Sequence, residues 1–591
     1  MLRGALSPQR RVSDLNRLAA EPLDVLVVGG GITGAGAALD AATRGLRVGI
    51  VEAQDWGSGT SSRSSKLIHG GLRYLEMLDF HLVHEALKER GLLLQKVAPH
   101  LVRPVPILYP LRNPLVERAY VGAGIALYDA LGWSTGTSRG LPLHRHLSRR
   151  KALALAPGLR RDSLAGAIEY YDAQVDDARY VVETVRTAAS FGALALNRVE
   201  AVGFLDEAGR VAGARLRDVE QGDDLEVRAA ATVLATGPWT EDTEALVGRQ
   251  RAVRVRPSKG VHLMVPKDRI EASVALVIRT ERSVLFVLPW GAHWLIGTTD
   301  TDWDHDKARP ITTAADVEYL LSHVNEVLSR PLVATDVEAV FAGLRPLVAG
   351  VGVVRGPGEK GAARIDRMAH DEAATTKVSR EHAVARPKPG LVVVSGGKYT
   401  TYRVMAADAI DAAVADAGLA VGASITERVP LLGAEGYEAR RNQLAMLAAD
   451  HGLPVESVSR LFDRYGTLVD EVLALVDEDS SLATALDDAD SGYIEAEVVH
   501  AVACEGARHL EDVLLRRTRI GVEDPDAAMR AAPLVAARMS RLLGWDADMV
   551  EREIDEYRRT AALEHDASHR PADDDEAARW VKESPSRLPL P

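Results

Sequence analysis

A glycine-rich turn between a short apolar run and a small-residue segment constrains this chain more than any other feature. Residues 23–28 read Leu-Asp-Val-Leu-Val-Val, and Gly29, Gly31 and Gly34 follow in the spacing G-x-G-x-x-G. The first glycine permits a tight turn, the second lets the backbone approach a pyrophosphate, and the third lets a helix pack closely on a strand. Phosphates would bind the free N–H groups at the start of the helix expected over residues 32–42. The pattern predicts a βαβ unit that binds a dinucleotide.

The segment after this unit favours FAD as the dinucleotide. A second strand expected over residues 47–51 ends in Glu52, at the distance typical of the acid that binds a ribose 2′-OH, and this acid disfavours the 2′-phosphate of NADP. The loop 54–66 is rich in Ser and Thr, whose hydroxyls suit the diphosphate and ribityl groups of an extended cofactor. Such a composition is also typical of a flexible linker. Because the loop directly follows the ribose acid, cofactor contact is the favoured interpretation.

Composition excludes several classes of protein. A chain of 591 residues is too long for a single core, so two or three domains are expected. The formal net charge of −13 argues against general nucleic-acid binding, which depends on basic surface. Cys504 is the only cysteine, which excludes an internal disulfide, a cysteine-based zinc site and an iron–sulfur cluster. No metal site is predicted, and any electron-carrying centre is expected to be organic.

The two ends of the chain are expected to be tails. Residues 1–20 are rich in arginine but lack the apolar core of a secretory signal, and Asp14 disfavours a transit peptide. They are expected to be a disordered lead-in, and residues 566–591 a frayed tail. Between them, no stretch approaches the roughly 20 apolar residues of a spanning helix.

The order of the expected elements predicts an α/β fold with three domains. A Rossmann-like FAD-binding domain is expected from residues 21–82, 171–242 and 384–430. An inserted β-rich substrate-binding (cap) domain is expected over 83–170 and 243–383, where short apolar runs bounded by Gly or Pro indicate strands. A helical C-terminal domain is expected over 431–565. Other expected elements are helices over 79–96, 180–191, 498–519 and from about residue 400, and strands over 230–239, 261–265, 284–288, 294–297 and 391–397.

Short motifs resemble the family of FAD-dependent glycerol-3-phosphate dehydrogenases in their order and spacing. Residues 64–76 read Ser-Ser-Lys-Leu-Ile-His-Gly-Gly-Leu-Arg-Tyr-Leu-Glu, and residues 505–519 resemble that family's C-terminal domain. The other matching segments are 258–262, 297–300, 342–346, 379–382 and 396–403. The matches extend from residue 21 to about residue 560. The resemblance implies FAD-dependent oxidation of sn-glycerol 3-phosphate to dihydroxyacetone phosphate, with hydride transfer to flavin N5.

Basic residues within these motifs are expected to bind the substrate. A phosphorylated alcohol is a dianion, and planar guanidinium groups bind phosphate through paired hydrogen bonds. A single arginine is usually a solvated surface cation, and it is the family match that reverses this interpretation. Arg345 and Arg380 are assigned to the phosphate, whereas Arg73 and Lys398 are expected to divide their contacts between phosphate and flavin. The expected substrate-binding residues are Arg73, Tyr74, His262, Arg345, Arg380 and Lys398.

His262 is ranked first as the base that takes the hydroxyl proton, because an ordinary histidine pKa of about 6.5 suits that role. A lone histidine at the start of an apolar strand is more often a packed or surface residue, so the ranking depends on the family position, which faces the substrate. Tyr74 could bond the same oxygen, and crowded cations could depress the pKa of a competing group. The expected catalytic residues are His262, Arg345 and Tyr74.

The turn 396–398 is expected to lie beside the flavin. A helix that begins near Thr400 would direct its positive end at the reduced ring and favour hydride uptake. His69 is either a structural hydrogen-bonding residue or a functional one, and the turn 297–300 could be purely structural. The expected cofactor contacts are Gly29, Gly31, Gly34, Glu52, Thr60, Ser61, Ser62, Ser65, Lys66, His69, Gly70, Gly237, Gly397, Lys398 and Thr400.

The electron acceptor and the cellular location follow from the resemblance alone. Members of the family mostly pass electrons to a membrane quinone, which implies a peripheral protein on the cytoplasmic face of the inner membrane. The basic run 139–151 could bind anionic headgroups at about 1 kcal/mol per charge, or could be a solvated loop. The rival functions are an oxidase that uses O₂ and a non-catalytic flavin-binding sensor or scaffold. A homodimer is left open.

Overall fold

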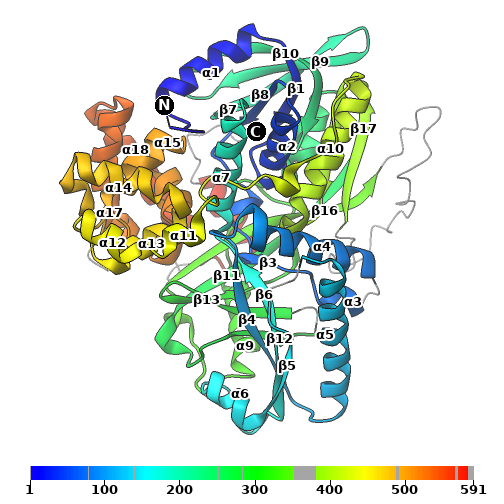
Figure 1. The fold of residues 1–591 in the computed structure, drawn as a ribbon, viewed down its shortest axis with the longest axis vertical. Coiled ribbons are helices and arrows are strands. Elements are labelled where there is room, and N and C mark those ends of the chain that lie inside the picture. The colour runs from blue at the N-terminus through cyan, green and yellow to red at the C-terminus, as the bar shows by residue number, and fades with distance from the viewer. Residues whose placement is uncertain are drawn as a thin grey trace.

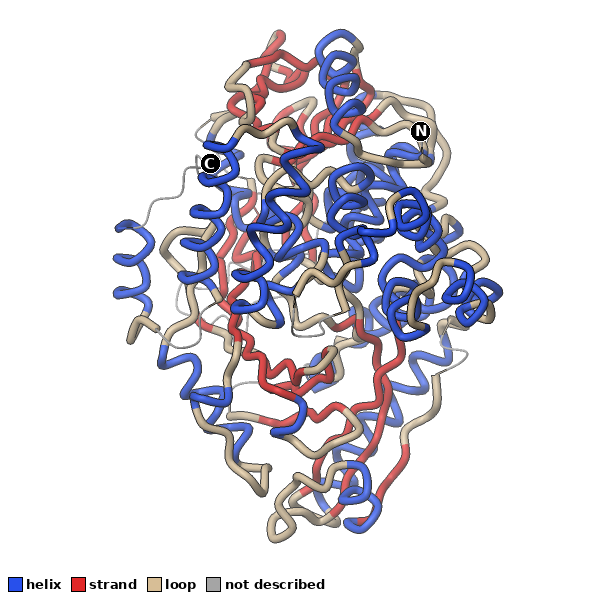
Figure 2. Tube along the Cα trace, turned by 90° about the vertical axis from the view of Figure 1, so that its left-hand side faces the viewer, coloured by secondary structure: helices blue, strands red, loops and turns tan. Residues whose placement is uncertain are grey.

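The protein consists of two sheets arranged along its long axis, with a helical lobe at one side (Figure 1). The computed structural model describes residues 2–583 except 77–78, 138–140, 249–251, 282–283, 352–380, 488–491 and 566–569. In the orthogonal view, the strands run through the middle of the molecule and helices cover them on both sides (Figure 2). Among the described helices, none combines the length and the apolar character needed to cross a bilayer.

The first sheet has a parallel core, as the glycine-rich turn predicts. Its parallel strands lie in the order β18 (Leu391–Gly396), β10 (Asp224–Leu234), β1 (Leu23–Val28), β2 (Val48–Glu52) and β7 (Leu194–Asn197). The antiparallel strands β17 (His382–Lys388), β8 (Val199–Glu207) and β9 (Arg210–Asp218) extend it. Alternate side chains of β1 serve two cores: Val25 and Val27 pack in one core, and Leu26 and Val28 in the other.

Helices α2 (Ile32–Thr43), α7 (Asp177–Ser190) and α10 (Tyr402–Ala417) contribute to the first of these cores. The small residues of α2 let its neighbours come close. A Cβ on Gly36 would lie 2.7 Å from the Tyr402 ring, so only glycine leaves room for this contact between α2 and α10.

The second sheet is mostly antiparallel. Its strands lie in the order β15 (Thr301–Asp302), β11 (Val253–Pro266), β14 (His293–Gly297), β13 (Val284–Trp290), β12 (Ala275–Arg279), β4 (Arg103–Leu111), β6 (Gly166–Gln174) and β3 (Leu67–Ile68). Strand β16 (Ala339–Val351) also pairs with β11, and β5 (Arg145–Ser148) pairs with β6. One core of this sheet includes α6 (Arg149–Leu155) and α9 (Ala314–Asn325), and the other includes α5 (Val116–Ser134).

The helical lobe extends from α11 (Tyr437–Arg441) to α18 (Ala547–Glu564). Helices α12 (Leu444–Asp450), α13 (Val455–Tyr465) and α14 (Val469–Glu478) share a core of their own. Helices α15 (Glu495–Cys504), α16 (Ile520–Glu523), α17 (Pro525–Leu543) and α18 instead share a core with the second sheet. Further helices are α3 (Arg73–Glu76), α4 (Phe80–Leu92), which continues as the π-helical turn Leu93–Val97, and α8 (Thr240–Ala245).

Both expected tails contain ordered helices, which corrects the prediction. Helix α1 (Pro8–Ala20) packs Leu18 at 1% exposure, and the Arg11 guanidinium donates to both oxygens of Asp218 at 2.9 and 3.0 Å. Helix α19 (Asp574–Glu583) lies within the expected tail 566–591, and Asp574 accepts a hydrogen bond from Lys259. The contacts that order both helices come from residues far away in the sequence, so local composition could not reveal them.

The helix expected over residues 498–519 is interrupted. Helix α15 ends at Cys504, a π-helical turn follows at Asp512–Arg517, and Arg519 adopts a left-handed backbone with φ +76° before α16 begins. The strand β3 also lies in the second sheet, although the prediction put its residues in the FAD-binding segment 21–82. A strand of two residues carries no periodicity that a sequence could display.

Candidate active site

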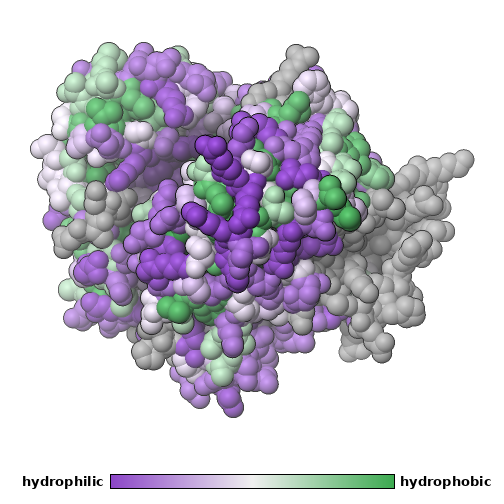
Figure 3. Space-filling view, turned by 90° about the horizontal axis from the view of Figure 1, so that it is seen from below, coloured by the Kyte–Doolittle hydropathy of each residue, from purple (hydrophilic) through white to green (hydrophobic). Residues whose placement is uncertain are grey.

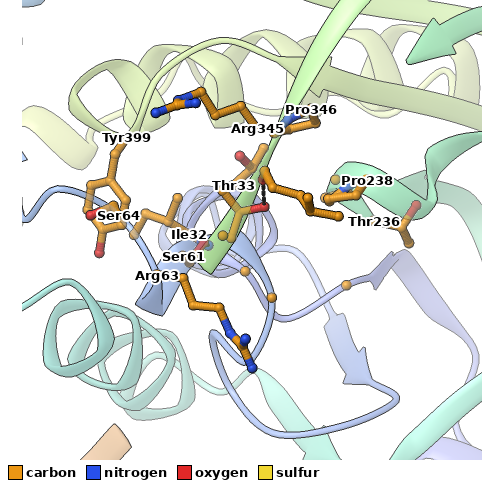
Figure 4. Close-up of a pocket in the computed structure, with 18 of the residues that line it drawn as sticks. Ile32, Thr33, Ser61, Arg63, Ser64, Thr236, Pro238, Arg345, Pro346 and Tyr399 are labelled. Carbon is orange, nitrogen blue, oxygen red and sulfur yellow. Dashed lines mark hydrogen bonds between the residues drawn. The ribbon is translucent and has the colours of Figure 1, made fainter. Parts of the chain in front are cut away.

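A cavity of about 350 Å³ lies where the first sheet meets the second. Its wall includes the glycine turn after β1, the residues after β10, the turn after β18, and parts of β11 and β16. Figure 4 shows Ser61 beside Ile32 and Thr33, with Thr236 and Pro238 to one side and Tyr399 and Ser64 to the other. A crevice at the carboxyl ends of parallel strands is the usual ligand site of such sheets.

The glycine turn has the geometry of a pyrophosphate cradle. Gly29 has φ +111°, and a Cβ there would lie 2.5 Å from the carbonyl oxygen of Ala235. A Cβ on Gly34 would lie 1.8 Å from the carbonyl oxygen of Gly29, so this glycine permits the packing of α2 without lining the cavity. Gly31 does line it, with room limited by Ser61 Oγ at 3.2 Å from a built Cβ. These residues fit a bound diphosphate.

Glu52 lines the cavity at the end of β2. Its carboxylate accepts hydrogen bonds from the backbone N–H groups of Gly30 at 2.6 Å and Gln54 at 2.9 Å. Burial raises the pKa of Glu52, although the two amides act in the opposite direction. The amides fix the orientation of the carboxylate, and its remaining acceptor positions fit a ribose hydroxyl.

The hydroxyl-rich loop contributes only part of what the sequence predicts. Thr60, Ser61 and Ser65 line the cavity. Ser62 does not, and Lys66 is 1% exposed, with Nζ donating to the Ser62 carbonyl oxygen at 3.1 Å. Lys66 therefore lies in the wall behind Ser65, contrary to the prediction that it contacts the cofactor.

His69 and Thr400 lock two parts of the wall together. The His69 N–H donates to Thr400 Oγ1 at 3.1 Å, and that hydroxyl donates back to the His69 carbonyl oxygen at 3.2 Å. Gly237, Gly397 and Lys398 line the same cavity. Gly70 lies outside the wall, where its N–H donates to the Tyr128 hydroxyl at 2.8 Å. The helix expected near Thr400 begins with a 3₁₀ turn, Tyr399–Thr401, that leads into α10.

Four of the expected substrate-binding side chains line this cavity: Tyr74, His262, Arg345 and Lys398. Lys398 Nζ lies 3.7 Å from the centre of the Tyr74 ring, which is a cation–π contact. Arg73 begins helix α3, but its side chain lies outside the described part of the structure. Arg380 also lies outside the described residues.

Paired glycines make room for Arg345 on the second sheet. Gly260 on β11 lies opposite Gly343 on β16. A Cβ on Gly260 would lie 2.5 Å from Arg345 Nη2, and a Cβ on Gly343 would lie 2.7 Å from the Arg63 side chain. Arg345 and Arg63 therefore occupy the space that side chains at positions 260 and 343 would fill. In Figure 4 these two arginines extend in opposite directions.

The turn 297–300 orients Arg345, a role that sequence alone left open. Arg345 Nη1 donates to the Thr299 carbonyl oxygen at 3.1 Å, and Nη2 donates to Thr298 Oγ1 at 2.9 Å. Arg345 Nη1 also lies 3.7 Å from an Asp300 carboxylate oxygen. The guanidinium is therefore held in place before any ligand binds.

His262 is buried in the same wall at 2% exposure. Its ring stacks on Phe341 with centroids 4.7 Å apart, and its Nε2 lies 2.9 Å from Ser65 Oγ. Burial, with the charges of Lys66 and Arg345, holds the pKa of His262 well below 6.5. The imidazole is therefore neutral at pH 7 and can accept a proton.

Sequence reasoning missed Tyr399 and Asp177. Tyr399 lines the cavity, and its hydroxyl donates to the Asp177 carbonyl oxygen at 2.6 Å. Tyr399 lies within the family-like motif 396–403, and its place in that motif could have indicated that it lines the site. Asp177 begins α7 and touches the loop after β2, a contact that no local pattern announces.

The two-sheet architecture, the glycine turn and the cavity between the sheets define a flavin-dependent oxidoreductase. Residues 24–403 match the FAD dependent oxidoreductase family, and residues 424–550 match the C-terminal domain of alpha-glycerophosphate oxidase. The chain is 49% identical over 580 residues to a glycerol-3-phosphate dehydrogenase of Mycobacterium leprae, covering 98% of this chain and 94% of that protein. It is 36% identical over 572 residues to the mitochondrial glycerol-3-phosphate dehydrogenase of Homo sapiens, covering 93% and 75%. The chain belongs to the family of FAD-dependent glycerol-3-phosphate dehydrogenases, and its cofactor is FAD.

Solved structures agree with this assignment. The glycerol-3-phosphate dehydrogenase of Bacillus halodurans, complexed with FAD, superposes with a TM-score of 0.76 at 27% identity and covers 94% of this chain and 98% of that one. An L-alpha-glycerophosphate oxidase of Mycoplasma pneumoniae with FAD bound has a TM-score of 0.50 at 16% identity, over 70% of this chain and 99% of that one. The second likeness shows a shared fold alone.

Proposed function

We propose that the protein oxidises sn-glycerol 3-phosphate to dihydroxyacetone phosphate and passes the electrons to a membrane quinone. The observation that carries the first part is the joint position of a buried imidazole and an oriented guanidinium in the wall that includes the glycine turn. The names of the relatives supply the identity of the substrate. FAD, when bound, supplies the hydride acceptor.

The residues of the chain perform two tasks in this proposal. Arg345 and Lys398 bind the phosphate dianion, and the fixed geometry of Arg345 lowers the entropic cost of that contact. His262 takes the hydroxyl proton of the alcohol as the carbon–hydrogen bond breaks, for which the imidazole must begin neutral. Tyr74 is assigned to the same alcohol oxygen.

Anaerobic titration of the FAD-loaded protein with glycerol 3-phosphate tests the reaction. We expect the visible absorbance band of the oxidised flavin to bleach stoichiometrically. Glycerol and inorganic phosphate serve as controls and should leave the spectrum unchanged. A holoprotein that stays yellow with saturating glycerol 3-phosphate would support the sensor or scaffold alternative.

The acceptor requires a separate experiment. The enzyme reduced by substrate is mixed with a soluble quinone or with O₂ in a stopped-flow instrument. Reoxidation that is much faster with the quinone supports the proposed acceptor, whereas rapid reoxidation by O₂ with release of peroxide would identify an oxidase.

We further propose peripheral contact with the membrane, supported by the exposed face of α5. Val116, Tyr120 and Trp133 are 73%, 57% and 68% exposed on this helix, and Leu127 is 40% exposed. They follow the spacing of one helical face, together with exposed Ala119, Ala123 and Ala130. A continuous apolar stripe of this kind usually marks an interaction site.

The charged residues of α5 lie away from this stripe. Glu117 accepts hydrogen bonds from the N–H groups of Arg112 and Asn113 at 2.7 and 2.8 Å, and Asp129 accepts one from His144. Arg118 donates to the Leu147 carbonyl oxygen at 3.0 Å. A helix with one apolar face and its charged residues on the other face suits the headgroup–acyl boundary of a bilayer.

The basic run 139–151 contributes fewer cations than its composition suggests. Residue 139 lies outside the described residues, His144 binds Asp129, and Arg145 pairs with Glu169 at 2.6 Å. Arg149, Arg150 and Lys151 at the start of α6 are exposed. Viewed from below, hydrophilic side chains occupy the middle of the visible face, and smaller hydrophobic clusters lie beside them (Figure 3). The proposed membrane surface is the α5 stripe, and the three exposed cations at the start of α6 are a second element of the proposal that is tested separately.

A further inference from the structure

Asp177, the first residue of α7, lies behind the cavity and is fully buried. One carboxylate oxygen accepts hydrogen bonds from the Ser64 N–H at 3.0 Å and from Ser64 Oγ at 2.7 Å. The other accepts from Lys66 Nζ at 2.7 Å and from Arg519 Nη2 at 3.1 Å. A single carboxylate therefore ties the loop after β2 to the helical lobe.

Two of its donors have an unusual backbone. Lys66 has φ +60° and Arg519 has φ +76°, and they are two of four described non-glycine residues in the left-handed region. Residues that carry a Cβ rarely adopt this backbone conformation, so surrounding contacts must maintain it. In both residues the side chain donates to Asp177 and also to the Ser62 carbonyl oxygen.

Ser65 lies between the two anchored residues of this turn. Its hydroxyl oxygen lies 2.9 Å from Nε2 of His262, and both side chains line the cavity. Asp177 fixes Ser64 on one side of Ser65 and Lys66 on the other. The direction of the Ser65 side chain thus depends on a carboxylate that does not line the cavity.

We propose that Asp177 is a positioning residue that acts on His262 through Ser65. Asp177 holds the turn 64–66, and the Ser65 hydroxyl then fixes the ring orientation and the tautomer of His262. Arg519 makes the helical lobe part of this arrangement. The inference rests on the proposed function for the role of His262, but the geometry it predicts is measurable without turnover.

A merely structural role for Asp177 makes a different prediction. A buried carboxylate that only stabilises the fold would, when neutralised, lower the melting temperature and leave the rate of the folded fraction unchanged. A positioning role changes the rate of the chemical step more than the affinity for substrate, because the phosphate contacts lie on other elements.

The test uses the FAD-loaded full chain with Ser65→Ala, Asp177→Asn and the double variant. The limiting rate of anaerobic flavin reduction and the Kd of glycerol 3-phosphate are measured together. We expect each single variant to reduce the limiting rate at least about 10-fold and to change Kd less than about 3-fold, since base catalysis contributes about 10²–10⁴-fold. The double variant should be no slower than Ser65→Ala by more than about 2-fold, because both changes remove the same interaction.

Asp40→Asn is the matched control, because Asp40 is also fully buried and lies 2.6 Å from a guanidinium, that of Arg44. It should lower the melting temperature without changing the limiting rate. If Asp177→Asn does not fold, Ser64→Ala removes one of the donors to Asp177 and takes its place. An unchanged limiting rate in Ser65→Ala, or independent losses that multiply in the double variant, would overturn the inference.

Crystal structures separate this inference from the proposed function. They are determined for the FAD-loaded Asp177→Asn variant, or Ser64→Ala in its place, and for the Asp40→Asn protein. We expect the distance from Ser65 Oγ to His262 Nε2 to exceed 3.5 Å, the usual hydrogen-bond limit, in the variant of the turn and to remain near 2.9 Å in the control. An unchanged distance in that variant overturns the inference. If glycerol 3-phosphate does not reduce the wild-type flavin, the proposed function fails, and these distances alone decide whether Asp177 positions Ser65.

Discussion

At the residue scale, Gly31 decides whether the cavity can accept a cofactor. A Cβ there already lies 3.2 Å from Ser61 Oγ, and the branches of a larger side chain would occupy the space that a diphosphate needs. We expect Gly31→Val to fold but to purify without bound FAD, measured by the ratio of flavin to protein absorbance. Gly422→Val is the control, since no atom lies within 4 Å of a Cβ at Gly422. A yellow Gly31→Val protein would contradict the cradle.

His262 predicts an unusual dependence of the chemical step on pH. The base is the neutral imidazole, and its pKa lies well below 6.5 because of burial and the charges of Lys66 and Arg345. The limiting rate of flavin reduction at saturating substrate should therefore stay level from pH 8 down to about pH 6.5, where an ordinary histidine is half protonated. His262→Ala should retain FAD and lose at least about 100-fold in that rate. A rate that halves near pH 6.5 would show that the proton acceptor has an ordinary pKa.

Arg345 should govern affinity more than rate. A hydrogen bond to a charged group contributes about 1.5–3 kcal/mol, which corresponds to about 10- to 150-fold in Kd. We expect Arg345→Ala to raise the Kd of glycerol 3-phosphate by about that factor, measured from the substrate dependence of flavin reduction. Arg345→Lys keeps the charge without the fork and should lie in between. An unchanged Kd would remove Arg345 from the phosphate site.

Motifs in the sequence indicated several residues that the structure places in the cavity wall, and their roles stay predictions. Gly29, Gly31, Glu52, His262 and Arg345 stand in motifs, and the structure brings them to one cavity. The sequence did not predict that Lys66 turns away from the cavity, because its partner Asp177 is more than a hundred positions away. The sequence of a binding motif does not distinguish a lysine that contacts a ligand from one that pairs with a buried carboxylate.

At the scale of elements, the sequence predicted the strands and helices that are formed by continuous runs of apolar residues. The strands β1 and β18 and the helix α2 lie close to their expected positions. Nearly all of their side chains are buried, and most are apolar, so the sequence pattern alone marks them. The helix expected over 498–519 is interrupted within 505–519, where charged residues are buried among the apolar ones. Asp512 and Arg516 bind each other and their neighbours Arg198 and Asp55, and an apolar periodicity carries no record of such pairing.

His509, within the same segment, predicts a stability that depends on pH. Burial and Arg198 lower its pKa, but Glu220 at 2.9 Å and Glu553 at 2.8 Å outweigh them and raise it to about 9. Because the folded pKa exceeds the unfolded value of about 6.5, this stabilisation is complete below pH 6.5 and is lost as the pH rises toward 9. At 1.36 kcal/mol per unit it amounts to about 3 kcal/mol at most.

Thermal unfolding of the holoprotein at pH 6.5 and pH 9 measures this effect. The wild type should lose more of its melting temperature over this range than His509→Gln, in which the glutamates face an uncharged amide at both pH values. Equal losses in the two proteins would show that His509 does not titrate between the folded and unfolded states.

At the scale of the whole molecule, the active-site cavity depends on all three parts of the chain. The first sheet supplies the glycine turn, and the second supplies His262 and Arg345. Arg519 of the helical lobe binds Asp177 behind this wall. The expected division into three domains does not express this dependence. The short strand β3 and the buried ion pairs cross the expected boundaries.

The largest-scale prediction concerns the membrane, and it follows from a local departure from the net charge of −13. A protein with this charge should be repelled by anionic vesicles unless its cations and apolar groups gather on one surface. Binding is measured by co-sedimentation with phosphatidylcholine vesicles that contain about 30% phosphatidylglycerol, a fraction chosen to give a strongly anionic surface. Neutralising Arg149, Arg150 and Lys151 to Gln should weaken binding by about 100-fold at about 1 kcal/mol per charge. This loss should shrink at high salt, because salt screens the charges.

The apolar stripe should act independently of lipid charge. We expect the double substitution Tyr120→Ser and Trp133→Ser to weaken binding to anionic vesicles at both low and high salt, because burial of aromatic surface does not depend on ionic strength. Met446→Ser is the matched control, since Met446 is 50% exposed on α12 in the helical lobe, away from the stripe. Equal binding by the stripe variant and this control would show that α5 does not face the bilayer. Binding lost only in the charge variant would reduce the proposed surface to the start of α6.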